Sequence, residues 1–329
     1  MDDLIPVAEI NGGYLLRRHL IEIGYSDRWI RRAVKAGWLT RLRHGTYTPT
    51  ELHRRRDADE RYRVLVRSVL DRLGPSVAAT HQSAAVLHGL DMHGVKTDKV
   101  HVTRLDGLAG HTEAGIVHHA GQIDPDRDLV VVDGLLVTRV QRAVVETASQ
   151  SSIEAGMVVA SSALRLAQFS KEELEDHAAT YERWRGTRAA RIAVRLSDGR
   201  LETVGEVRSL HMMWRHGIPY PELQFEVRTV NGVVIARTDF AWIRCRHTGE
   251  FDGMKKYGRL NPFTSDPGRT IENEKVREDL VRDQLVGMSR WGWAGLEPAA
   301  QKDTADMIKR GMERSERLYV RGRTIIPLG

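Results

Sequence analysis

Apolar positions near the start of the chain recur with helical spacing and are interrupted by turn residues. One apolar stripe runs from Tyr14 to Ile23 and stops at Gly24, which predicts a short amphipathic helix followed by a glycine C-cap. A second helix is expected over 27–36, because Ser26 is a favourable N-cap. Two short helices joined by a tight turn predict a helix-turn-helix.

The pattern changes from helical to alternating directly after these helices. Residues 38–43 alternate apolar and polar side chains, residues 44–45 are a plausible turn, and residues 46–48 return, which predicts a β-hairpin. We therefore expect residues 1–56 to form a winged helix-turn-helix domain, with the hairpin as its wing. The basic residues expected to contact DNA are Arg28, Arg31, Arg32, Lys35, Arg41 and Arg43.

The charge distribution points to the same segment. The 329-residue chain has 50 Lys and Arg against 44 Asp and Glu, a net charge of +6. Residues 1–56 contain eleven Lys or Arg and six Asp or Glu, and eleven minus six gives +5 of that total. A basic head on a nearly neutral remainder predicts nucleic-acid binding, because phosphate neutralisation supplies most sequence-independent affinity. A solvated basic face, or a winged helix that contacts proteins, is the alternative.

The segment GGYLLRRHLIEIGYSDRWIRRAVKAGWLTRLRHGTYTP resembles the N-terminal domain of AbiEi-type antitoxins, which belong to type IV toxin–antitoxin systems. The resemblance covers residues 8–50 and rests on two helices, each followed by glycine, and on Gly-x-Leu-x-Arg-x-x-x-Gly-x-Tyr. It implies DNA binding, autoregulation of a promoter, and a nucleotidyltransferase-like toxin as partner.

Residues 57–197 are expected to form a central α/β domain with a helical connector. The pattern predicts a charged helix over 58–73, strands over 99–103 and 115–119, and a hairpin across Asp133–Gly134. The order THQSAAVLHGL, VHVTR and VDGLLVTRVQRAVVETA also resembles AbiEi-type antitoxins, to about residue 165.

Half of the histidines gather in this central region. The seven are His81, His88, His93, His101, His111, His118 and His119. Zinc binding is one interpretation, but the spacings repeat no ligand pattern on one helix, and the only cysteine is the distant Cys245. We therefore expect strand histidines that form local hydrogen bonds.

Residues 198–329 carry a pattern of mixed helices and strands. The expected elements are a helix over 203–216, strands over 223–227, 233–242 and 248–253, a charged helix over 271–286, and a last strand near 291–293. Asn231–Gly232 is a strong hairpin signal between the first two strands.

Three carboxylates in this region suggest metal chemistry. Glu250 and Asp252 share one face of a strand, and pairing with the strand of Asp239 would bring all three together. Three close anions repel one another unless a cation lies among them, and an all-oxygen set suits Mg²⁺ or Mn²⁺. The expected metal ligands are Asp239, Glu250 and Asp252, and Glu206 and Lys256 complete the candidate catalytic set.

This arrangement resembles the PD-(D/E)XK superfamily, particularly Vsr-like endonuclease domains, over residues 202–296. The resemblance implies a restriction-endonuclease-like α/β domain with a mixed sheet and metal-dependent hydrolysis of DNA. The superfamily's lysine is replaced by Asp252 here, so Lys256 or Lys255 would have to act in its place. A purely structural role for Glu206, in a capping box, is the alternative.

Three functions follow from these patterns: a DNA-binding protein with a nuclease-like tail, a non-catalytic repressor and antitoxin, or a protein-interaction module that neutralises a toxin. The sequence has no run of about 18 apolar residues, so we expect no membrane-spanning helix. The first ten residues lack the features of a secretory signal, and a cytoplasmic protein is expected.

Overall fold

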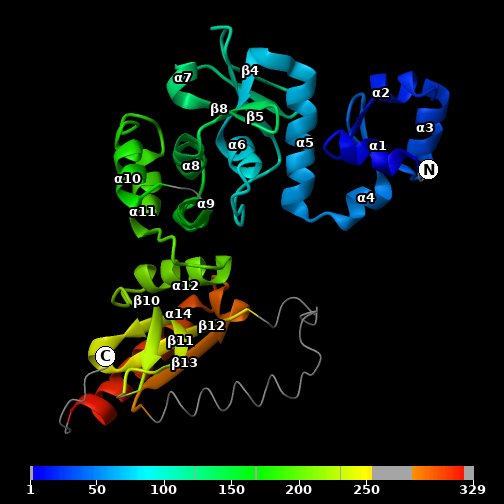
Figure 1. The fold of residues 1–329 in the computed structure, drawn as a ribbon. Helices are drawn as coiled ribbons and strands as arrows, with labels where there is room; N and C mark the ends of the chain where they lie inside the picture. The colour runs from blue at the N-terminus through cyan, green and yellow to red at the C-terminus, as the bar shows by residue number, and fades with distance from the viewer. Residues whose placement is uncertain (1–2, 122, 167–168, 230, 254–283, 322–329) are drawn as a thin grey trace. The chain divides into compact units, whose positions relative to one another are not determined.

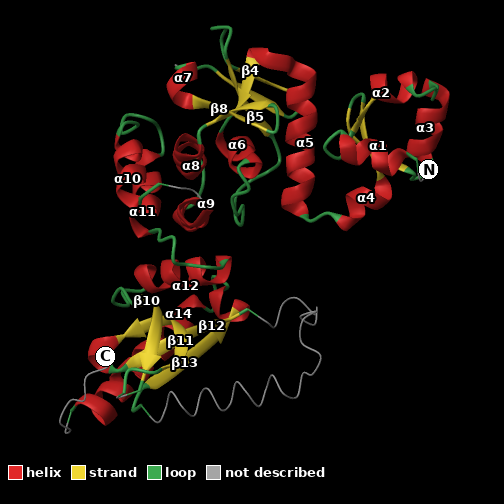
Figure 2. Cartoon of the chain, viewed as in Figure 1, coloured by secondary structure: helices red, strands yellow, loops and turns green. Residues whose placement is uncertain are grey.

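The structure is a computed structural model that describes residues 3–121, 123–166, 169–229, 231–253 and 284–321. The chain divides into two compact units, Met1–Arg195 and Leu196–Gly329. Each unit contains both helices and sheets (Figures 1 and 2). The first unit contains the head (residues 3–56) and the central region, which we expected to be separate domains.

The head is a set of short helices around a three-stranded antiparallel sheet with the strand order β1-β3-β2. Its elements are α1 (Leu4–Ile10), β1 (Leu15–Leu16), α2 (Arg17–Glu22), α3 (Asp27–Lys35), β2 (Leu39–Arg43), β3 (Thr46–Pro49) and α4 (Thr50–Arg55). It has a core of its own, made by Leu4, Ala8, Leu15, Leu20, Ile30, Ala33 and Leu39.

Two features of the head differ from the sequence prediction. The expected helix from Tyr14 begins three residues later, because Leu15 and Leu16 pair as a strand with Tyr47 and Thr46. Both leucines are buried, and their pairing with a segment thirty residues downstream outweighs local helical spacing. Helix α1 was not predicted at all. The second predicted helix and the hairpin are confirmed as α3 and β2–β3.

The central region is a six-stranded mixed sheet, with the strand order β6-β7-β5-β4-β9-β8. Its strands are β4 (Val77–Ala79), β5 (Val100–Arg104), β6 (His111–Glu113), β7 (Ile116–His119), β8 (Leu129–Val132) and β9 (Leu135–Thr138). Its helices are α5 (Ala58–Leu73), α6 (His81–Leu87), α7 (Pro125–Asp128), α8 (Val140–Ser149), α9 (Ile153–Leu166), α10 (Lys171–Ala179) and α11 (Thr187–Leu196). The predicted Asp133–Gly134 turn is confirmed between β8 and β9, and both residues have positive φ, as a tight hairpin requires.

Helices α6 and α8 pack against each other, and α6 also lies against β5 and β9. This packing buries the alanine- and valine-rich stretches of both helices in the main core of the unit. Strand β4 leads into α6 and pairs with β5 (Figure 1). Strand β5 in turn pairs with β7, so residues of α6, β5 and β7 come close together in space.

The second unit is built on a four-stranded mixed sheet with the strand order β10-β11-β12-β13. Its elements are α12 (Val204–Arg215), β10 (Glu222–Arg228), β11 (Val234–Trp242), β12 (His247–Asp252), β13 (Gly287–Gly292) and α14 (Gln301–Ser315), with short helical turns at Ile243–Cys245, Trp293–Leu296 and Glu316–Val320. Strands β10, β11 and β12 are antiparallel, whereas β13 runs parallel to β12. Helices α12 and α14 pack against β12 and against each other. The charged helix expected over 271–286 lies almost entirely outside the described residues.

Candidate nucleic-acid interface and carboxylate site

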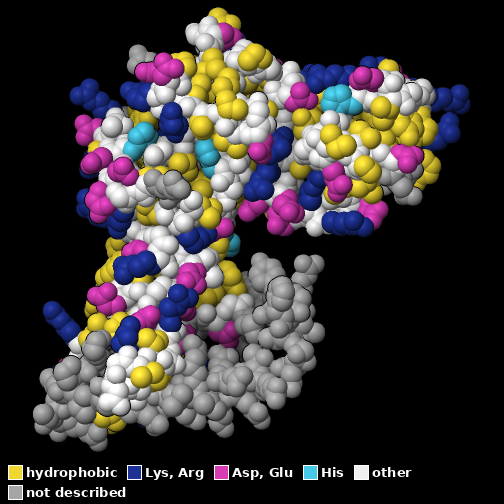
Figure 3. Space-filling view, in the orientation of Figure 1, with side chains coloured by type: hydrophobic (Ala, Val, Ile, Leu, Met, Phe, Trp, Pro, Cys, Tyr) yellow, Lys and Arg dark blue, Asp and Glu magenta, His cyan; other side chains and the backbone are white. Residues whose placement is uncertain are grey.

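Helix α3 presents a row of cations on its outer face. Arg28, Arg31, Arg32 and Lys35 are all exposed, and their spacing of three and four residues places them side by side. Within the part of the chain that the structure describes, the side chains of these four residues form no hydrogen bond or ion pair with protein. Figure 3 shows Lys and Arg side chains projecting where α3 forms the outer edge of the head. The face is therefore available to an anionic partner.

The sequence around α3 explains why this face is held in place. The Ser26 hydroxyl accepts a hydrogen bond from the Trp29 amide at 3.2 Å and so caps the helix. Ile30 and Ala33 anchor the inner face, since both are buried. Arg17, on α2, donates from Nε to Asp27 at 2.6 Å, and this bond lowers the pKa of Asp27.

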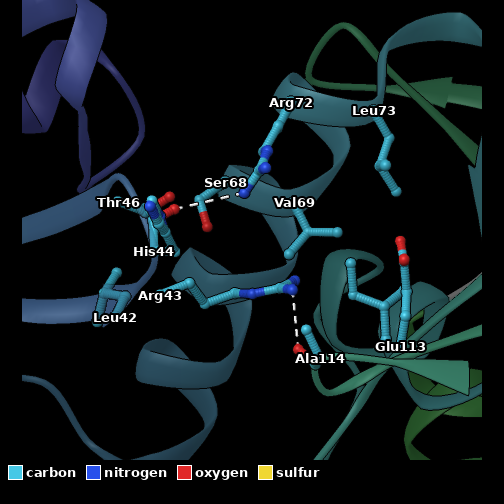
Figure 4. Close-up of a pocket in the computed structure, with 11 residues that line it drawn as sticks. Leu42, Arg43, His44, Thr46, Ser68, Val69, Arg72, Leu73, Glu113 and Ala114 are labelled. Carbon is cyan, nitrogen blue, oxygen red and sulfur yellow. Dashed lines mark hydrogen bonds between the residues drawn. The ribbon is translucent and has the colours of Figure 1, made fainter.

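The two hairpin arginines lie in different surroundings, although we expected both to contact DNA. The pairing of β2 with β3 shifts between Arg41 and Arg43, which breaks the simple alternation of side chains. Arg41 is exposed. Arg43 turns toward the central sheet, where its Nη2 donates to the Ala114 carbonyl at 2.8 Å (Figure 4). Burial lowers the pKa of Arg43.

A pocket of about 470 Å³ lies beside Arg43 (Figure 4). Arg72 of α5 approaches it from the other side and donates to the His44 carbonyl at 3.4 Å. The pocket is lined by Leu42, Arg43, His44, Thr46, Ser68, Val69, Arg72, Leu73, Glu113, Ala114 and Ile116. The hairpin is thus connected to the central region on both sides of this pocket.

In the second unit, the predicted strand pairing that underlies the carboxylate site is confirmed. Strands β11 and β12 are antiparallel with Phe240 opposite Gly249, so Asp239 and Glu250 stand at neighbouring positions of adjacent strands. Each has a partner within the protein. Asp239 Oδ2 accepts a hydrogen bond from the Phe251 amide at 2.7 Å, and Glu250 Oε2 lies 2.9 Å from Arg290 Nη2.

With these contacts in place, the three carboxylates do not converge on one point where they could bind the same ion. Glu250 is buried, whereas Asp252 is exposed at the end of β12. Among the described residues, two groups of three possible ligands lie within 4.8 Å of one another, both in the central region: His81, His101 and His119, and His111, Glu113 and His118. Asp239, Glu250 and Asp252 form no such group in that part of the chain. Their donor chemistry suits Mg²⁺ or Mn²⁺, but in this geometry Arg290 occupies the place of a cation beside Glu250.

Glu206 has a capping role in the structure. Its backbone amide donates to Thr203 Oγ1 at 3.2 Å, and its carboxylate accepts from the Thr203 hydroxyl at 2.8 Å and from the Glu202 amide at 2.9 Å. Gln224 Nε2 donates to the same carboxylate at 2.8 Å. These contacts give Glu206 a structural role at the N-terminus of α12, and its catalytic role stays a prediction. Lys256, and Lys255 beside it, lie outside the described residues.

Comparisons with known proteins fit the architecture of the head. Residues 2–50 match the family described as "Transcriptional regulator, AbiEi antitoxin". Two relatives from Mycobacterium tuberculosis, Uncharacterized protein MT2308 (strain CDC 1551 / Oshkosh) and Uncharacterized protein Rv2248 (strain ATCC 25618 / H37Rv), are each 30% identical over 249 residues. That alignment covers 75% of this chain and 86% of each relative. The chain belongs to the family of these mycobacterial proteins.

The AbiEi-type domain of this family member thus coincides with the head that carries α3. The match to the mycobacterial relatives extends far beyond residues 2–50, so the family shares more than this domain. Among the helices that the structure describes, none is long and apolar enough to cross a bilayer.

The histidines of the central region behave only partly as predicted. Local hydrogen bonds are present: His88 Nε2 lies 2.7 Å from the Thr138 carbonyl, and His101 Nδ1 lies 2.9 Å from His119 Nε2. The buried ring nitrogens of His118, in contrast, have no hydrogen-bond partner among the described residues, although Glu113 Oε1 lies 3.5 Å from His118 Nε2.

Three of these histidines come together from separate elements: His81, His101 and His119. Burial is the main cause of a lowered pKa at each, and it brings the pKa of His101 to about 3. Sequence spacing could not reveal this group, because its members belong to α6, β5 and β7.

Proposed function

We propose that this protein is a DNA-binding transcriptional regulator of the AbiEi antitoxin type. In this proposal the head is a winged helix-turn-helix, and the outer face of α3 enters the major groove. Arginine in that position can form bidentate hydrogen bonds with guanine. A protein of this kind would act in the cytoplasm, on the promoter of its own operon.

The observation that carries the proposal is the state of the α3 cations. Arg28, Arg31, Arg32 and Lys35 are exposed, whereas Arg17 and Arg18 nearby are paired with Asp27 and Asp71. Cations without protein partners can neutralise phosphates and release counterions, and this is the main source of affinity for DNA. The family match over residues 2–50 supports the same conclusion.

The decisive experiment measures binding to a fragment of the protein's own promoter by fluorescence anisotropy at several salt concentrations. For the double variant Arg31→Ala/Arg32→Ala we expect weaker binding. The slope of log K against log salt concentration should also become shallower, by about 0.9 for each phosphate that the variant no longer neutralises. Arg191→Ala is the matched control, because it removes an exposed arginine from α11. Unchanged affinity and salt dependence in the double variant would refute the proposal and favour a protein-binding head.

An antitoxin also needs a toxin, and we propose a nucleotidyltransferase-like toxin as the second partner. The family description of the head names an antitoxin and so supports a toxin partner, while the nucleotidyltransferase-like class rests on the resemblance to AbiEi-type antitoxins. Co-expression of the protein with a toxin encoded beside it should restore growth that the toxin alone arrests. Growth arrest that persists at full expression of the protein would contradict the antitoxin role and leave the regulator role intact.

A second candidate function belongs to the C-terminal unit: hydrolysis of DNA phosphodiester bonds by a restriction-endonuclease-like domain. The favouring observation is the mixed sheet, in which Asp239 and Glu250 stand on neighbouring strands. Asp239, Glu250 and Asp252 would hold Mg²⁺ or Mn²⁺, which would supply charge stabilisation and a more acidic water. In this proposal Arg290 must release Glu250 before the ion binds, and Glu206 and Lys256 complete the site.

Nicking of supercoiled plasmid at millimolar Mg²⁺ or Mn²⁺ tests this second function. Wild-type protein should nick the plasmid, and Asp239→Asn should not. No nicking by the wild type, or equal nicking by both proteins, would eliminate hydrolysis and leave a regulator alone.

A further inference from the structure

Three histidines from three separate elements meet on one side of the central sheet. His81 is the first residue of α6, His101 lies on β5, and His119 ends β7. One ring nitrogen of each lies within 4.8 Å of the others, and the closest pair, His101 Nδ1 and His119 Nε2, is 2.9 Å apart. Of these rings, His81 and His101 are buried, and His119 is half-buried.

We propose that His81, His101 and His119 form a binding site for a divalent transition-metal cation, with Zn²⁺ as the best-fitting ion. Imidazole nitrogens bind zinc at about 2.0–2.1 Å in tetrahedral geometry, which places neighbouring ligand nitrogens about 3.3 Å apart. The separation of 2.9 Å between His101 Nδ1 and His119 Nε2 is somewhat shorter than this value, and one nitrogen of His81 lies within 4.8 Å of the ligand atoms of both. The stacked rings of His81 and His119, with centroids 4.1 Å apart, must turn so that both nitrogens face the ion.

The hydrogen bond between His101 and His119 already has the arrangement of a ligand pair. Two imidazole nitrogens that face each other at 2.9 Å share one proton between two lone pairs. A metal ion can replace that proton and accept both lone pairs, and metal binding to protein ligands generally releases protons in this way. His119 is only half-buried, so the group is partly open to solvent.

The backbone at His81 is held in an unusual conformation that supports a functional site. His81 has φ +51, in the left-handed region, which is costly for a residue with a Cβ atom. The buried carboxylate of Glu146 accepts a hydrogen bond from the His81 amide at 3.0 Å and thus holds this conformation. The same carboxylate lies 3.7 Å from His81 Nδ1, and Thr80 Oγ1 lies 3.1 Å from that nitrogen.

A carboxylate behind a histidine is a recurrent feature of metal sites, because it orients the ring and increases its basicity. The carboxylates of Glu146 and Asp128 are balanced by Arg142, which pairs with both, and by Arg127, which pairs with Asp128. An all-nitrogen set selects zinc-like ions over Mg²⁺ and Ca²⁺, which prefer oxygen.

The chain offers a matched control on the other face of the same strand. His118 and His119 are consecutive on β7, so their side chains point to opposite faces. His118 stacks on His111, with ring centroids 4.3 Å apart. His111 and Glu113, the other members of this second group, are exposed. Loss of His111 therefore removes a surface histidine and leaves the first group untouched.

The test measures zinc binding to the tag-free full-length chain by isothermal titration calorimetry and elemental analysis. We expect one equivalent of Zn²⁺ in the wild type, unaffected by millimolar Mg²⁺. His101→Gln and His119→Gln should each weaken binding by more than about 100-fold, the upper range for removal of a residue that merely supports a ligand. His111→Gln should bind as the wild type does.

Co²⁺ provides an independent readout, since its visible absorption reports tetrahedral coordination. The band should appear with the wild type and with His111→Gln, and be absent with His119→Gln. Far-UV circular dichroism verifies folding, and His119→Gln decides the outcome if His101→Gln does not fold, because its ring is only half-buried. No zinc bound by the folded wild type, or full binding retained by His119→Gln, would overturn the proposal.

Discussion

Arg43 of the hairpin donates a hydrogen bond from Nη2 to the carbonyl of Ala114, in the turn between β6 and β7, at 2.8 Å. This contact joins the head to the central sheet across more than seventy residues of sequence. It also places the two hairpin arginines in different surroundings. Arg43 contacts the central sheet, whereas the Arg41 side chain, whose Nε donates to the Arg43 carbonyl at 3.4 Å, is exposed to solvent.

The first prediction follows from this difference and rests on the proposed DNA binding. Arg41→Ala should weaken DNA binding. It should also make the slope of log K against log salt concentration shallower by about 0.9, the value for one phosphate contact. Arg43→Ala should leave the salt dependence unchanged. Anisotropy titrations of both variants at several salt concentrations distinguish the two residues. An equal reduction of salt dependence in Arg43→Ala would show that Arg43 leaves Ala114 when DNA binds.

The second prediction concerns a buried ion network in the central region. Arg142 has a side chain only 3% exposed and pairs with Glu146 and Asp128, each at 2.8 Å. Arg142→Ala should destabilise the first unit by about 3–5 kcal/mol, because it leaves the buried carboxylate of Glu146 without its cation and leaves Asp128 with Arg127 alone. Urea denaturation followed by circular dichroism measures the destabilisation.

Arg127 is the matched control for Arg142, because it also contacts Asp128, at 2.9 Å, but its side chain is 72% exposed. Exposed ion pairs contribute about 0–1 kcal/mol, so Arg127→Ala should shift the unfolding midpoint only slightly. Similar destabilisation in the two variants would mean that the burial of Arg142 is not what makes it important.

Local signals in the sequence predicted a good part of this fold. Ser26 predicted the start of α3, and Asp133–Gly134 predicted the turn between β8 and β9, because capping and turn formation depend on neighbouring residues. Strand β1 at Leu15–Leu16 was missed, since its partner β3 lies thirty residues further along the chain.

In the candidate sites, too, contacts between residues far apart in the sequence could not be predicted. The pairing of the Asp239 strand with the Glu250 strand followed from alternation and a hairpin turn. The ion pair of Glu250 with Arg290 could not be predicted in this way, because Arg290 stands opposite Glu250 on a parallel strand forty residues away. The group formed by His81, His101 and His119 was missed for the same physical reason: its members meet only through the crossover connections of the sheet.

The third prediction tests the packing of α12 on the sheet of the second unit. A Cβ atom at Gly205 would overlap the ring of Phe251, and that ring is fixed by an edge-to-face contact with Trp293 at 5.2 Å. Gly205→Ala should therefore destabilise the unit by about 1–3 kcal/mol. At an open helical position the same change would stabilise by up to about 1 kcal/mol.

A double-mutant cycle with Phe251→Ala isolates this overlap. The combined variant should be destabilised by less than the sum of the two single variants, because removal of the ring relieves the clash. Gly253→Ala is the control, since its Cβ would stand at an ordinary 3.6 Å from the same ring. If the destabilisations of the two single variants simply add, a contact other than the Phe251 ring causes the effect of Gly205→Ala.

The fourth prediction is a pH dependence that arises from His247 at the start of β12. Its ring is buried, with Nδ1 2.9 Å from Ser315 Oγ and Nε2 2.9 Å from Ser289 Oγ. Burial lowers the pKa of His247 to about 4, against about 6.5 in an unfolded chain. Between these values the unfolded chain binds a proton that the folded unit does not, so the free energy of unfolding falls as the pH falls.

The stabilisation from neutral His247 should be fully present above about pH 6.5 and lost as the pH falls toward 4. A shift of this size corresponds to about 3 kcal/mol in total, since each pKa unit is worth about 1.36 kcal/mol. Calorimetric unfolding of the full chain between pH 4 and 8, with wild type and His247→Gln compared, measures the effect. The variant should show a flatter pH dependence of the transition of the second unit, because glutamine cannot take up the proton. Parallel curves for the two proteins would assign the pH dependence to groups other than His247.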